Sequence, residues 1–545
     1  MTSPEQRMAD LLKTFGDPAA CTAQLLCDRH PADAVAFTVV DADLNGHDMT
    51  YGELRESSAR MASALAALGV GPGDRVATLM SKSAELLVAT LAIWRTGAVQ
   101  VPLFTAFAPP AIALRITGNG TKVVITDAGQ RPKLAAGPDL PTDQPWRIIT
   151  TGPTEEGDLS FAELLAGHPP LDEPAVLGGD ATIVELFTSG TSGPPKAVPI
   201  PLRAVAGFAM YQEFGLDHRP TDVFWNAADP GWAYGLYYAI IAPLALGLRS
   251  LLYNSLFSAE GTWAVLSRFN VTNFTAGPTV YRKLRGTPAP DDVRLRCASA
   301  AGEPLPADVV SWAERTLGIP VRDHYGSTEL GMAIANAWHP ALRTDLKPGS
   351  MGRPLPGWSV TVLREDTNSA VAEAGMPGRV AMDITKSPLM WFEGYRDAPE
   401  RTAEKFSPDG HWFYSGDTAS RDEDGHLFFS GRSDDVILMA GYRIGPFEVE
   451  SVLLEHEAVA EAAAVGVPHE EHGEVMEAFV VLRAGASSPS DPDALAAELQ
   501  QLVKDRLAKH AYPRRVHFVT ELPKTSSGKT QRFLLRPRQV SSRAR

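Results

Sequence analysis

A loop rich in glycines and hydroxyl groups follows a strand-like segment at residues 187–198. The residues able to do chemistry there are Thr188, Ser189, Gly190, Thr191, Ser192, Gly193 and Lys196. Glycines let the backbone fold tightly and turn its N–H groups toward one point, which makes a concavity that binds phosphate. The loop is not the P-loop of NTPases, because Pro195 and Ala197 interrupt the G-x4-G-K-[ST] pattern. The segment therefore predicts a phosphate-binding loop of a different kind.

A second polar segment stands at the end of an expected strand, at residues 323–329. It reads Asp323, His324, Tyr325, Gly326, Ser327, Thr328 and Glu329. The carboxyl ends of parallel strands are where α/β sheets bind ligands. Tyr325 offers an aromatic face for a base, Thr328 a hydroxyl, and Glu329 a hard oxygen for Mg²⁺. Taken alone, the segment equally fits a turn that contains a satisfied acid.

Two weaker signals lie further along the chain. Asp417 lies between turns and suits a ribose diol, while Arg432 suits a diol or a phosphate. Residues 523–532 form a polar segment with three cations, among them Lys529 directly after a glycine. Alone, this last segment equally fits a disordered basic tail.

The elements expected to position these residues alternate from about residue 50 onward. Strands are predicted at 75–80, 98–103, 122–126, 181–187, 222–228, 248–254, 271–276, 295–300 and 320–325, and helices at 61–68, 84–94, 202–213, 234–246, 260–269, 278–285 and 306–317. Such alternation predicts parallel sheets with helices on their faces. Residues 127–180 are predicted to be loops, and 360–430 a smaller β-rich region.

The last hundred residues have a different texture. A helix is predicted to begin at Pro446, followed by strands at 459–467 and 475–482, a helix at 492–509 and a strand at 515–519. This pattern predicts a small α+β domain. A chain of 545 residues also exceeds the size of one hydrophobic core, about 250–300 residues, so at least two domains are expected.

Composition excludes several classes of protein. Fifty Lys and Arg against 65 Asp and Glu give a net charge of −15, which disfavours non-specific nucleic-acid binding. Three cysteines make no disulfide framework, and the first twenty residues lack an apolar targeting segment, which favours the cytoplasm. The longest apolar stretch, residues 232–248, is shorter than the about 20 residues of a membrane span.

Taken in this order and spacing, the motifs resemble the adenylate-forming superfamily of acyl-CoA synthetases, peptide-synthetase adenylation domains and luciferases. The resemblance covers about residues 30–535. Gly302, Glu303 and Pro304 resemble the family's adenine-side loop, and Gly441, Tyr442 and Arg443 its C-terminal motif. Residues 225–232 and 277–284 are most similar to short- and medium-chain acyl-CoA synthetases.

The resemblance implies two half-reactions. A carboxylate attacks the α-phosphate of ATP to give an acyl-adenylate and pyrophosphate, and CoA then takes the acyl group and releases AMP. Thr188–Lys196 would hold the β- and γ-phosphates, Thr328 the α-phosphate, and Glu329 Mg²⁺. Tyr325 would stack on adenine, Asp417 and Arg432 would hold the ribose, and Lys529 would reach the α-phosphate and acyl oxygens.

The resemblance also implies the architecture. We expect a large N-terminal α/β domain, residues 1–432, with two parallel-type sheets, packed helices and a small β-rich subdomain. A small mobile α+β domain, residues 433–545, would turn about a hinge at Asp434. The turn would withdraw Lys529 and bring Gly441 toward the pantetheine of CoA.

Strict acetyl-CoA synthetases carry a tryptophan that closes the acyl pocket, and the matching position here is Gly326. We therefore expect room for a C4–C8 or branched acid, with Trp232, Gly326, Leu330 and Gly331 as pocket walls. A flat aromatic acid would also fit, and Trp232 could instead be simple core packing.

Two other readings differ in acceptor or in class. A free-standing adenylation enzyme would load a carrier protein in place of CoA, and a non-catalytic ligand sensor would keep the fold without the chemistry. The joint presence of Lys196, Glu329, Asp417, Arg432 and Lys529 disfavours a sensor. The oligomeric state, the pathway and acylation of Lys529 as a switch stay open.

Overall fold

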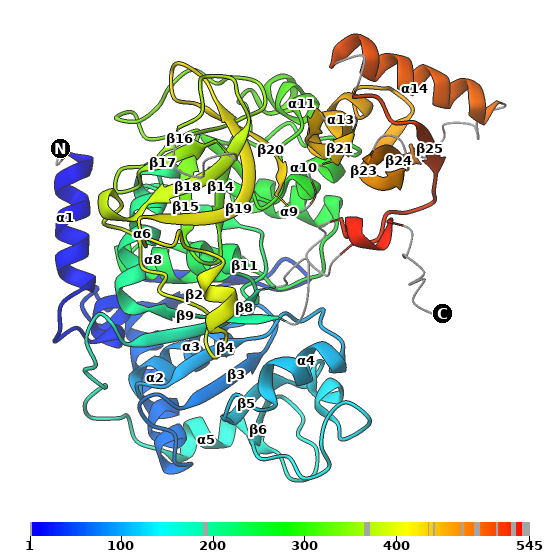
Figure 1. Ribbon diagram of the computed structural model, residues 1–545. Coiled ribbons are helices and arrows are strands. Elements are labelled where there is room, and N and C mark those ends of the chain that lie inside the picture. The colour runs from blue at the N-terminus through cyan, green and yellow to red at the C-terminus, as the bar shows by residue number, and fades with distance from the viewer. Residues whose placement is uncertain are drawn as a thin grey trace, which may run out of the picture.

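The computed structural model describes residues 3–188, 195–364, 371–433, 435, 437–439, 442–469, 473–483, 491–507, 511–524 and 530–536. Figure 1 shows a large part built on two sheets and a small part, which carries α13 and α14, at its upper right. The predicted fold class, a large N-terminal α/β part followed by a small α+β part, is confirmed. No helix of the described residues is long and apolar enough to cross a membrane.

The first sheet has seven strands and lies in the lower half of Figure 1. In sheet order the strands are β7 (Leu159–Ser160), β6 (Arg147–Thr151), β5 (Thr121–Asp127), β3 (Arg75–Leu79), β4 (Val99–Pro102), β8 (Thr182–Thr188) and β9 (Lys196–Pro201). All neighbours run parallel except β8 and β9, which form an antiparallel hairpin. Its helices are α2 (Tyr51–Ala67), α3 (Ala84–Arg95), α4 (Pro109–Ile116) and α5 (Phe161–Gly167).

The prediction that residues 127–180 are loops is partly wrong, because β6, β7 and α5 lie there. The apolar signal of β6 is only Ile148 and Ile149, flanked by threonines and by proline-rich segments. Pairing with β5 and burial stabilise a strand whose own sequence pattern is weak.

The second sheet has thirteen strands. In sheet order they are β17 (Val360–Leu363), β18 (Gly378–Asp383), β19 (Trp412–Arg421), β20 (Leu427–Arg432), β16 (Ser350–Pro354), β15 (Gly331–Ala335), β14 (Arg322–Ser327), β13 (Cys297–Ala301), β12 (Asn273–Ala276), β10 (Phe224–Asn226), β11 (Ser250–Tyr253), β1 (Val35–Val40) and β2 (Gly46–Thr50). The run from β14 to β1 is parallel, and both ends are antiparallel. The predicted β-rich region is thus joined to the larger sheet through β16 and β20.

Further helices lie at the N-terminal end of the chain and against the second sheet. The α-helices are α1 (Pro4–Phe15), α6 (Val205–Met210), α7 (Ala233–Gly235), α8 (Ala242–Leu246), α9 (Ala259–Arg268), α10 (Pro278–Leu284), α11 (Ala307–Leu317) and α12 (Pro399–Ala403). Two π-helical turns, η4 (Tyr211–Gly215) and η5 (Leu236–Ile241), continue α6 and α7. Wide turns of this kind are frequent at functional sites.

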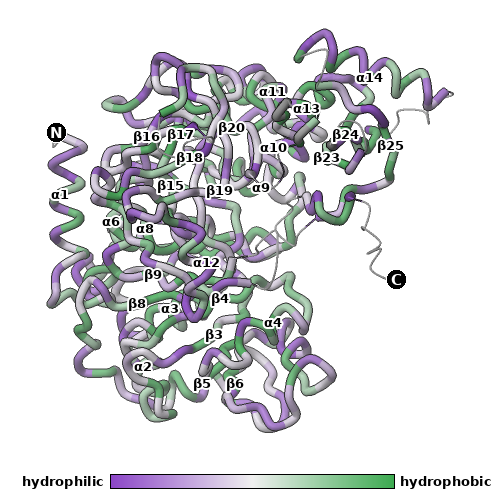
Figure 2. The backbone as a smooth tube through the Cα atoms, in the orientation of Figure 1, coloured by the Kyte–Doolittle hydropathy of each residue, from purple (hydrophilic) through white to green (hydrophobic). Residues whose placement is uncertain are grey.

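The small part is a five-stranded sheet with two helices. Its strands are β22 (Tyr442–Ile444), β21 (Ile437–Met439), β24 (Gly473–Leu482), β23 (Val459–His469) and β25 (Arg515–Phe518), and its helices α13 (Pro446–Leu453) and α14 (Pro492–Arg506), followed by η7 (Arg532–Leu534). Pro446 opens α13 as predicted. Figure 2 shows hydrophilic and hydrophobic stretches alternating along α14, whose Leu499 and Val503 enter the core of this part.

Candidate active site

The β8–β9 hairpin positions the first predicted residues. Thr188 and Lys196 lie opposite each other where the two strands meet the loop. The Lys196 ammonium lies 4.7 Å from the ring centroid of Tyr395. Ser189, Gly190, Thr191, Ser192 and Gly193 lie outside the described residues.

A cavity of about 320 Å³ opens beside this hairpin, between α4, β9 and the start of α12. Lys196, Arg396 and Arg401 contribute cations to its wall. Arg396 donates to the buried carboxylate of Glu185 on β8, with Nη1 2.8 Å from Oε2. This ion pair ties the chain that leads into α12 to the strand that leads into the phosphate loop.

Glu329 follows β14 and is buried. Its Oε1 accepts a hydrogen bond of 2.6 Å from the Tyr395 hydroxyl. Burial raises the pKa of Glu329, but the nearby Lys405 ammonium and the hydrogen bond from Tyr395 outweigh burial, so this pKa lies below its usual value. A carboxylate held ionised in this way suits a cation.

Thr328 is held through its backbone. Its carbonyl accepts from the hydroxyl of Tyr237, at 3.0 Å. Tyr237 lies on η5, so a wide helical turn contacts the end of the predicted nucleotide motif.

Asp417, Arg432 and Tyr325 are brought together by β14, β19 and β20. Asp417 and Arg432 are cross-strand partners, and Arg432 Nη1 lies 3.3 Å from Asp417 Oδ1. The Tyr325 hydroxyl donates to the other oxygen, Asp417 Oδ2, at 2.5 Å. The predicted adenine and ribose residues thus share one carboxylate.

The predicted adenine-side loop is anchored by the carboxylate of Glu303, which belongs to the loop. Gly302 has φ +98°, a backbone conformation that favours glycine. Glu303 Oε1 accepts from the Thr279 hydroxyl at 2.5 Å, and Oε2 accepts from Arg282 at 3.0 Å, which ties the loop to α10. Pro304 is partly exposed beside it.

Asp323 and His324 begin the same motif but face different surroundings, since successive side chains of a strand alternate. Burial raises the pKa of Asp323 well above its usual value. His324 lies in the core, where Nδ1 lies 2.7 Å from the Tyr211 hydroxyl and Nε2 lies 3.3 Å from the Asn336 carbonyl. Burial lowers the pKa of His324 to about 3, so the ring is neutral.

The structure corrects the reasoning about Gly326. An ideal Cβ on Gly326 would lie 2.0 Å from the carbonyl oxygen of Gly331 and 2.7 Å from Met332 Cα. A β-bulge between Tyr325 and Gly326 turns this position toward β15. The space expected from the absence of an indole is therefore filled by backbone in this direction.

The other predicted pocket walls fall into two groups. Gly331, with φ +71°, approaches the rings of Phe208 and Tyr238, and Leu330 beside it is buried. Trp232 instead packs on the first sheet's side, 5.2 Å and 5.6 Å from the rings of Phe104 and Phe107. The four walls do not form one cluster.

The hinge and CoA-side residues are described only in part. Asp434, Gly441 and Lys529 lie outside the described residues, and of Tyr442 and Arg443 the structure describes the backbone, in β22. The segment after Lys529 is anchored, because Arg532 donates to Glu450 at 2.7 Å.

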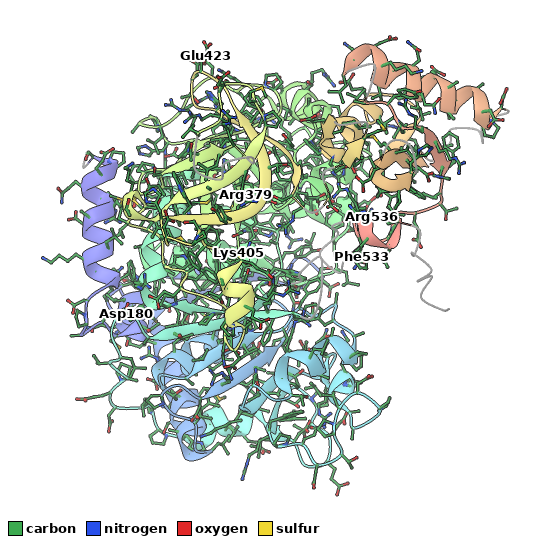
Figure 3. All side chains as sticks on the ribbon, viewed as in Figure 1. Asp180, Arg379, Lys405, Glu423, Phe533 and Arg536 are labelled. Atoms are coloured by element: carbon green, nitrogen blue, oxygen red, sulfur yellow. The ribbon has the colours of Figure 1, made fainter. Side chains whose placement is uncertain are left out.

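Two residues of the site escaped sequence reasoning. Tyr395 joins Lys196 to Glu329, and Lys405 lies close enough to Glu329 and Asp417 to affect charge at the site. Neither belongs to a spaced motif. Figure 3 shows Lys405 near the centre of the molecule, between its upper and lower halves.

The donor set fits a hard, well-hydrated cation. The described residues hold no group of three His, Cys, Asp or Glu side chains that could cage a metal ion. One carboxylate, Glu329, beside the predicted phosphate-binding residues matches Mg²⁺, which keeps several waters and takes substrate phosphates as ligands.

Residues 24–395 match the family of AMP-binding enzymes, and residues 448–529 match the AMP-binding enzyme C-terminal domain. The chain belongs to the AMP-binding enzyme family, and its predicted place in the adenylate-forming superfamily is confirmed.

The chain is similar to known acyl-CoA synthetases. The chain is 34% identical over 516 residues to the mouse mitochondrial acyl-coenzyme A synthetase ACSM3, covering 92% of this chain and 86% of the relative. It is 34% identical to the acetyl-coenzyme A synthetase of Bacillus subtilis, covering 89% and 84%.

Two solved structures share the fold over nearly the whole chain. An acyl-CoA synthetase from Brucella canis is 40% identical with a TM-score of 0.75, and covers 98% of this chain and 97% of its own. A benzoate CoA ligase from Burkholderia xenovorans is 31% identical with a TM-score of 0.81, and covers 97% and 99%.

Proposed function

We propose that the protein is an ATP-dependent, AMP-forming acyl-CoA synthetase. It activates a short- to medium-chain carboxylic acid as an acyl-adenylate and transfers the acyl group to CoA. The observation that carries the proposal is the convergence of Lys196, Glu329, Asp417 and Arg432 around Tyr325 and Tyr395. A binding protein without chemistry has no need of this set together.

The residues divide the first half-reaction among them. Lys196 and the hairpin loop after Thr188 bind the β- and γ-phosphates, and Thr328 binds the α-phosphate. Arg432 and Asp417 hold the ribose, Tyr325 lies against the adenine, and the loop at Gly302, Glu303 and Pro304 borders it. Such a transfer needs positioning and charge neutralisation more than covalent help.

Glu329 would hold Mg²⁺, which when bound would supply charge neutralisation on the phosphates. Lys529 brings a second positive charge to the α-phosphate and acyl oxygens, where negative charge develops during attack. His324 supports this surface from behind, since its ring bonds within the core, and Asp323 lies on the opposite face of the strand.

The second half-reaction uses the division of the chain into residues 1–432 and 433–545. A turn about Asp434 moves Lys529 away and brings Gly441, Tyr442 and Arg443 to the CoA thiol. The thiolate attacks the acyl carbon, and AMP leaves with its phosphate.

The aromatic residues near Gly331 bear on the acyl group. Phe208, Tyr237 and Tyr238 gather around Gly331, and an aromatic acid is the second candidate because such a surface accepts a flat ring. A carrier protein is the alternative acceptor. The three cysteines are free and buried, which supports a reducing compartment such as the cytoplasm.

The test is a panel of carboxylates from C2 to C12 with benzoate, each with ATP, Mg²⁺ and CoA, followed by mass detection of AMP and thioester. We expect AMP and acyl-CoA in equal amounts, with a maximum at C4–C8. A maximum with benzoate would select the aryl-CoA ligase. Acid-dependent pyrophosphate without thioester would move the acceptor to a carrier protein.

A matched pair of variants ties the result to the site. Glu329→Gln keeps the shape of the side chain and removes its charge, so AMP formation is expected to fall at least about 100-fold. Glu423→Gln, an exposed position, is expected to retain wild-type turnover. Equal activity in both variants would contradict the assigned site.

A further inference from the structure

Lys405 lies two residues beyond α12, and its backbone is held firmly. Its carbonyl accepts from the backbone N–H of Tyr414 at 2.7 Å, and Phe406 forms an isolated β-bridge with Phe413. The ring of Phe406 also stacks on that of Phe392, with centroids 6.1 Å apart. The backbone position from which the Lys405 side chain extends is therefore fixed beside β19.

The ammonium reaches into the middle of the site. Nζ donates to the carbonyl of Ser415 at 2.8 Å and lies 3.4 Å from that of Tyr414. Among the described residues these two carbonyls are its acceptors, which leaves its third hydrogen for an acceptor from outside the protein.

Gly416 shows which way the ammonium faces. An ideal Cβ on Gly416 would lie 3.5 Å from Lys405 Nζ and 3.5 Å from Arg432 Nη2. Gly416 has φ +90°, so the position also favours glycine on conformational grounds. Two cations thus lie close to the same position on β19, where glycine adds no side chain of its own.

Several cations gather near few described carboxylates in this region. Lys405 lies close enough to Lys196, Arg432, Glu329 and Asp417 to interact with their charges, and Asp417 is shared between Arg432 and Tyr325. Burial lowers the pKa of Lys405, with Glu329 and Asp417 opposing that effect and Arg432 and Lys196 adding to it. Like charges close together are unfavourable unless an anion lies between them.

We propose that Lys405 is a nucleotide-binding residue that holds the 5′-phosphate next to the ribose. The proposal rests on the proposed function, because it places the ribose at Asp417 and Arg432. Lys405 interacts electrostatically with that pair and with Glu329, and its ammonium lies near the same Cβ position as Arg432. The link from ribose to α-phosphate must pass from the ribose pair toward Glu329. Its charge therefore recognises the phosphate and not the nucleoside.

The test compares AMP with adenosine by calorimetry on the full-length protein, without metal ions. We expect the wild type to bind AMP more tightly than adenosine. Lys405→Met should weaken AMP about tenfold, the effect of one charge-assisted hydrogen bond, and leave adenosine affinity unchanged. Lys405→Arg should keep most of the preference for AMP.

The control is Lys386→Met, which removes an exposed lysine paired with Asp383 at 3.0 Å. It should keep the wild-type ratio of the two affinities. Unchanged adenosine binding shows that a Lys405 variant is folded, and Lys405→Gln replaces the methionine variant if it is not. An unchanged ratio in folded Lys405 variants would overturn this proposal alone, whereas wild-type protein that binds neither ligand would overturn the proposed function.

Discussion

Arg532 and Glu450 form a partly buried ion pair with two hydrogen bonds. Arg532 Nη2 lies 2.7 Å from Glu450 Oε2, and Nε lies 3.0 Å from Oε1. Glu450 lies on α13 and also accepts from the backbone of Ala464 on β23. Asp435, one residue after the proposed hinge, accepts from Arg536 at 3.1 Å and lies 3.5 Å from Arg532. Asp435, α13 and the segment around Arg532 are therefore bound into one unit, which would move as one body in the proposed hinge motion.

Replacement of Arg532 by Met should misplace the catalytic lysine. Arg532 anchors the segment three residues after Lys529, and a displacement of about 1 Å costs on the order of 100-fold in rate. We expect the rate of adenylation, measured as pyrophosphate release, to fall by about that factor. A supplied acyl-adenylate should still be converted to thioester. The control is Arg515→Met, an exposed arginine of β25. Unimpaired adenylation in the Arg532 variant would contradict the coupling.

Replacement of Lys529 by Ala should impair the first half-reaction and spare the second. Loss of one group that stabilises developing negative charge lowers the rate by roughly 100- to 1000-fold. We expect this loss in adenylation only, because in the proposed mechanism the turn about Asp434 withdraws Lys529 before thioester formation. The measurement is the rate of each half-reaction by mass. Equal loss in both would show that Lys529 has another role.

Replacement of Gly326 by Ala or Trp should destabilise the protein and not retune its acyl pocket. The added Cβ would overlap the carbonyl of Gly331, and overpacking against backbone costs roughly 1–3 kcal/mol. We expect a lower midpoint of unfolding in urea for both variants. Gly167→Ala is the control, since nothing lies within 4 Å of its Cβ position. A stable Gly326→Trp enzyme that prefers acetate would restore the original expectation.

Replacement of Tyr395 by Phe should weaken metal binding. The hydroxyl donates to Glu329 and helps to lower its pKa, so its loss raises that pKa. Because the carboxylate must be ionised to bind Mg²⁺, the acidic fall in activity should move to higher pH. We expect a requirement for about tenfold more Mg²⁺, as for other lost partners of metal ligands. Tyr512→Phe, in the small part, should change neither profile.

Acid should destabilise the fold through His324. Its pKa is about 3 in the folded protein against 6.5 when unfolded, so the unfolded chain binds more protons below pH 6.5. Stability is therefore lost as pH falls from about 6.5. Between pH 7 and 5, the free energy of unfolding measured in urea should decrease for both proteins. We expect the decrease to be roughly 2 kcal/mol smaller in His324→Gln than in the wild type. Exposed His47→Gln should follow the wild type, and a parallel slope in all three would refute this origin.

Much of the architecture could be predicted because buried strands and helices have strong periodicities. A strand was expected to end at Tyr325, and Tyr325 does meet Asp417, which in turn pairs with Arg432. The sequence could not show that one carboxylate serves both partners, since that depends on the pairing of β19 with β20.

The failures have physical causes as well. Tyr395 and Lys405 reach the site from irregular segments, where neither spacing nor periodicity marks a residue. The direction of Gly326 depends on a bulge in β14, which turns one position without changing the residue pattern. The β-rich region looked separate because β16 and β20 pair across a long stretch of chain.

The position of β1 has a consequence for how the chain folds. β1 (Val35–Val40) lies between β2 and β11 (Ser250–Tyr253), so its parallel partner is made more than two hundred residues later. The whole seven-stranded sheet is synthesised between them. A nascent chain must therefore carry the β1–β2 hairpin with one edge unpaired until β11 emerges, and contacts so distant in sequence form slowly. That waiting edge is where an emerging chain is most open to aggregation and where a chaperone would be most needed.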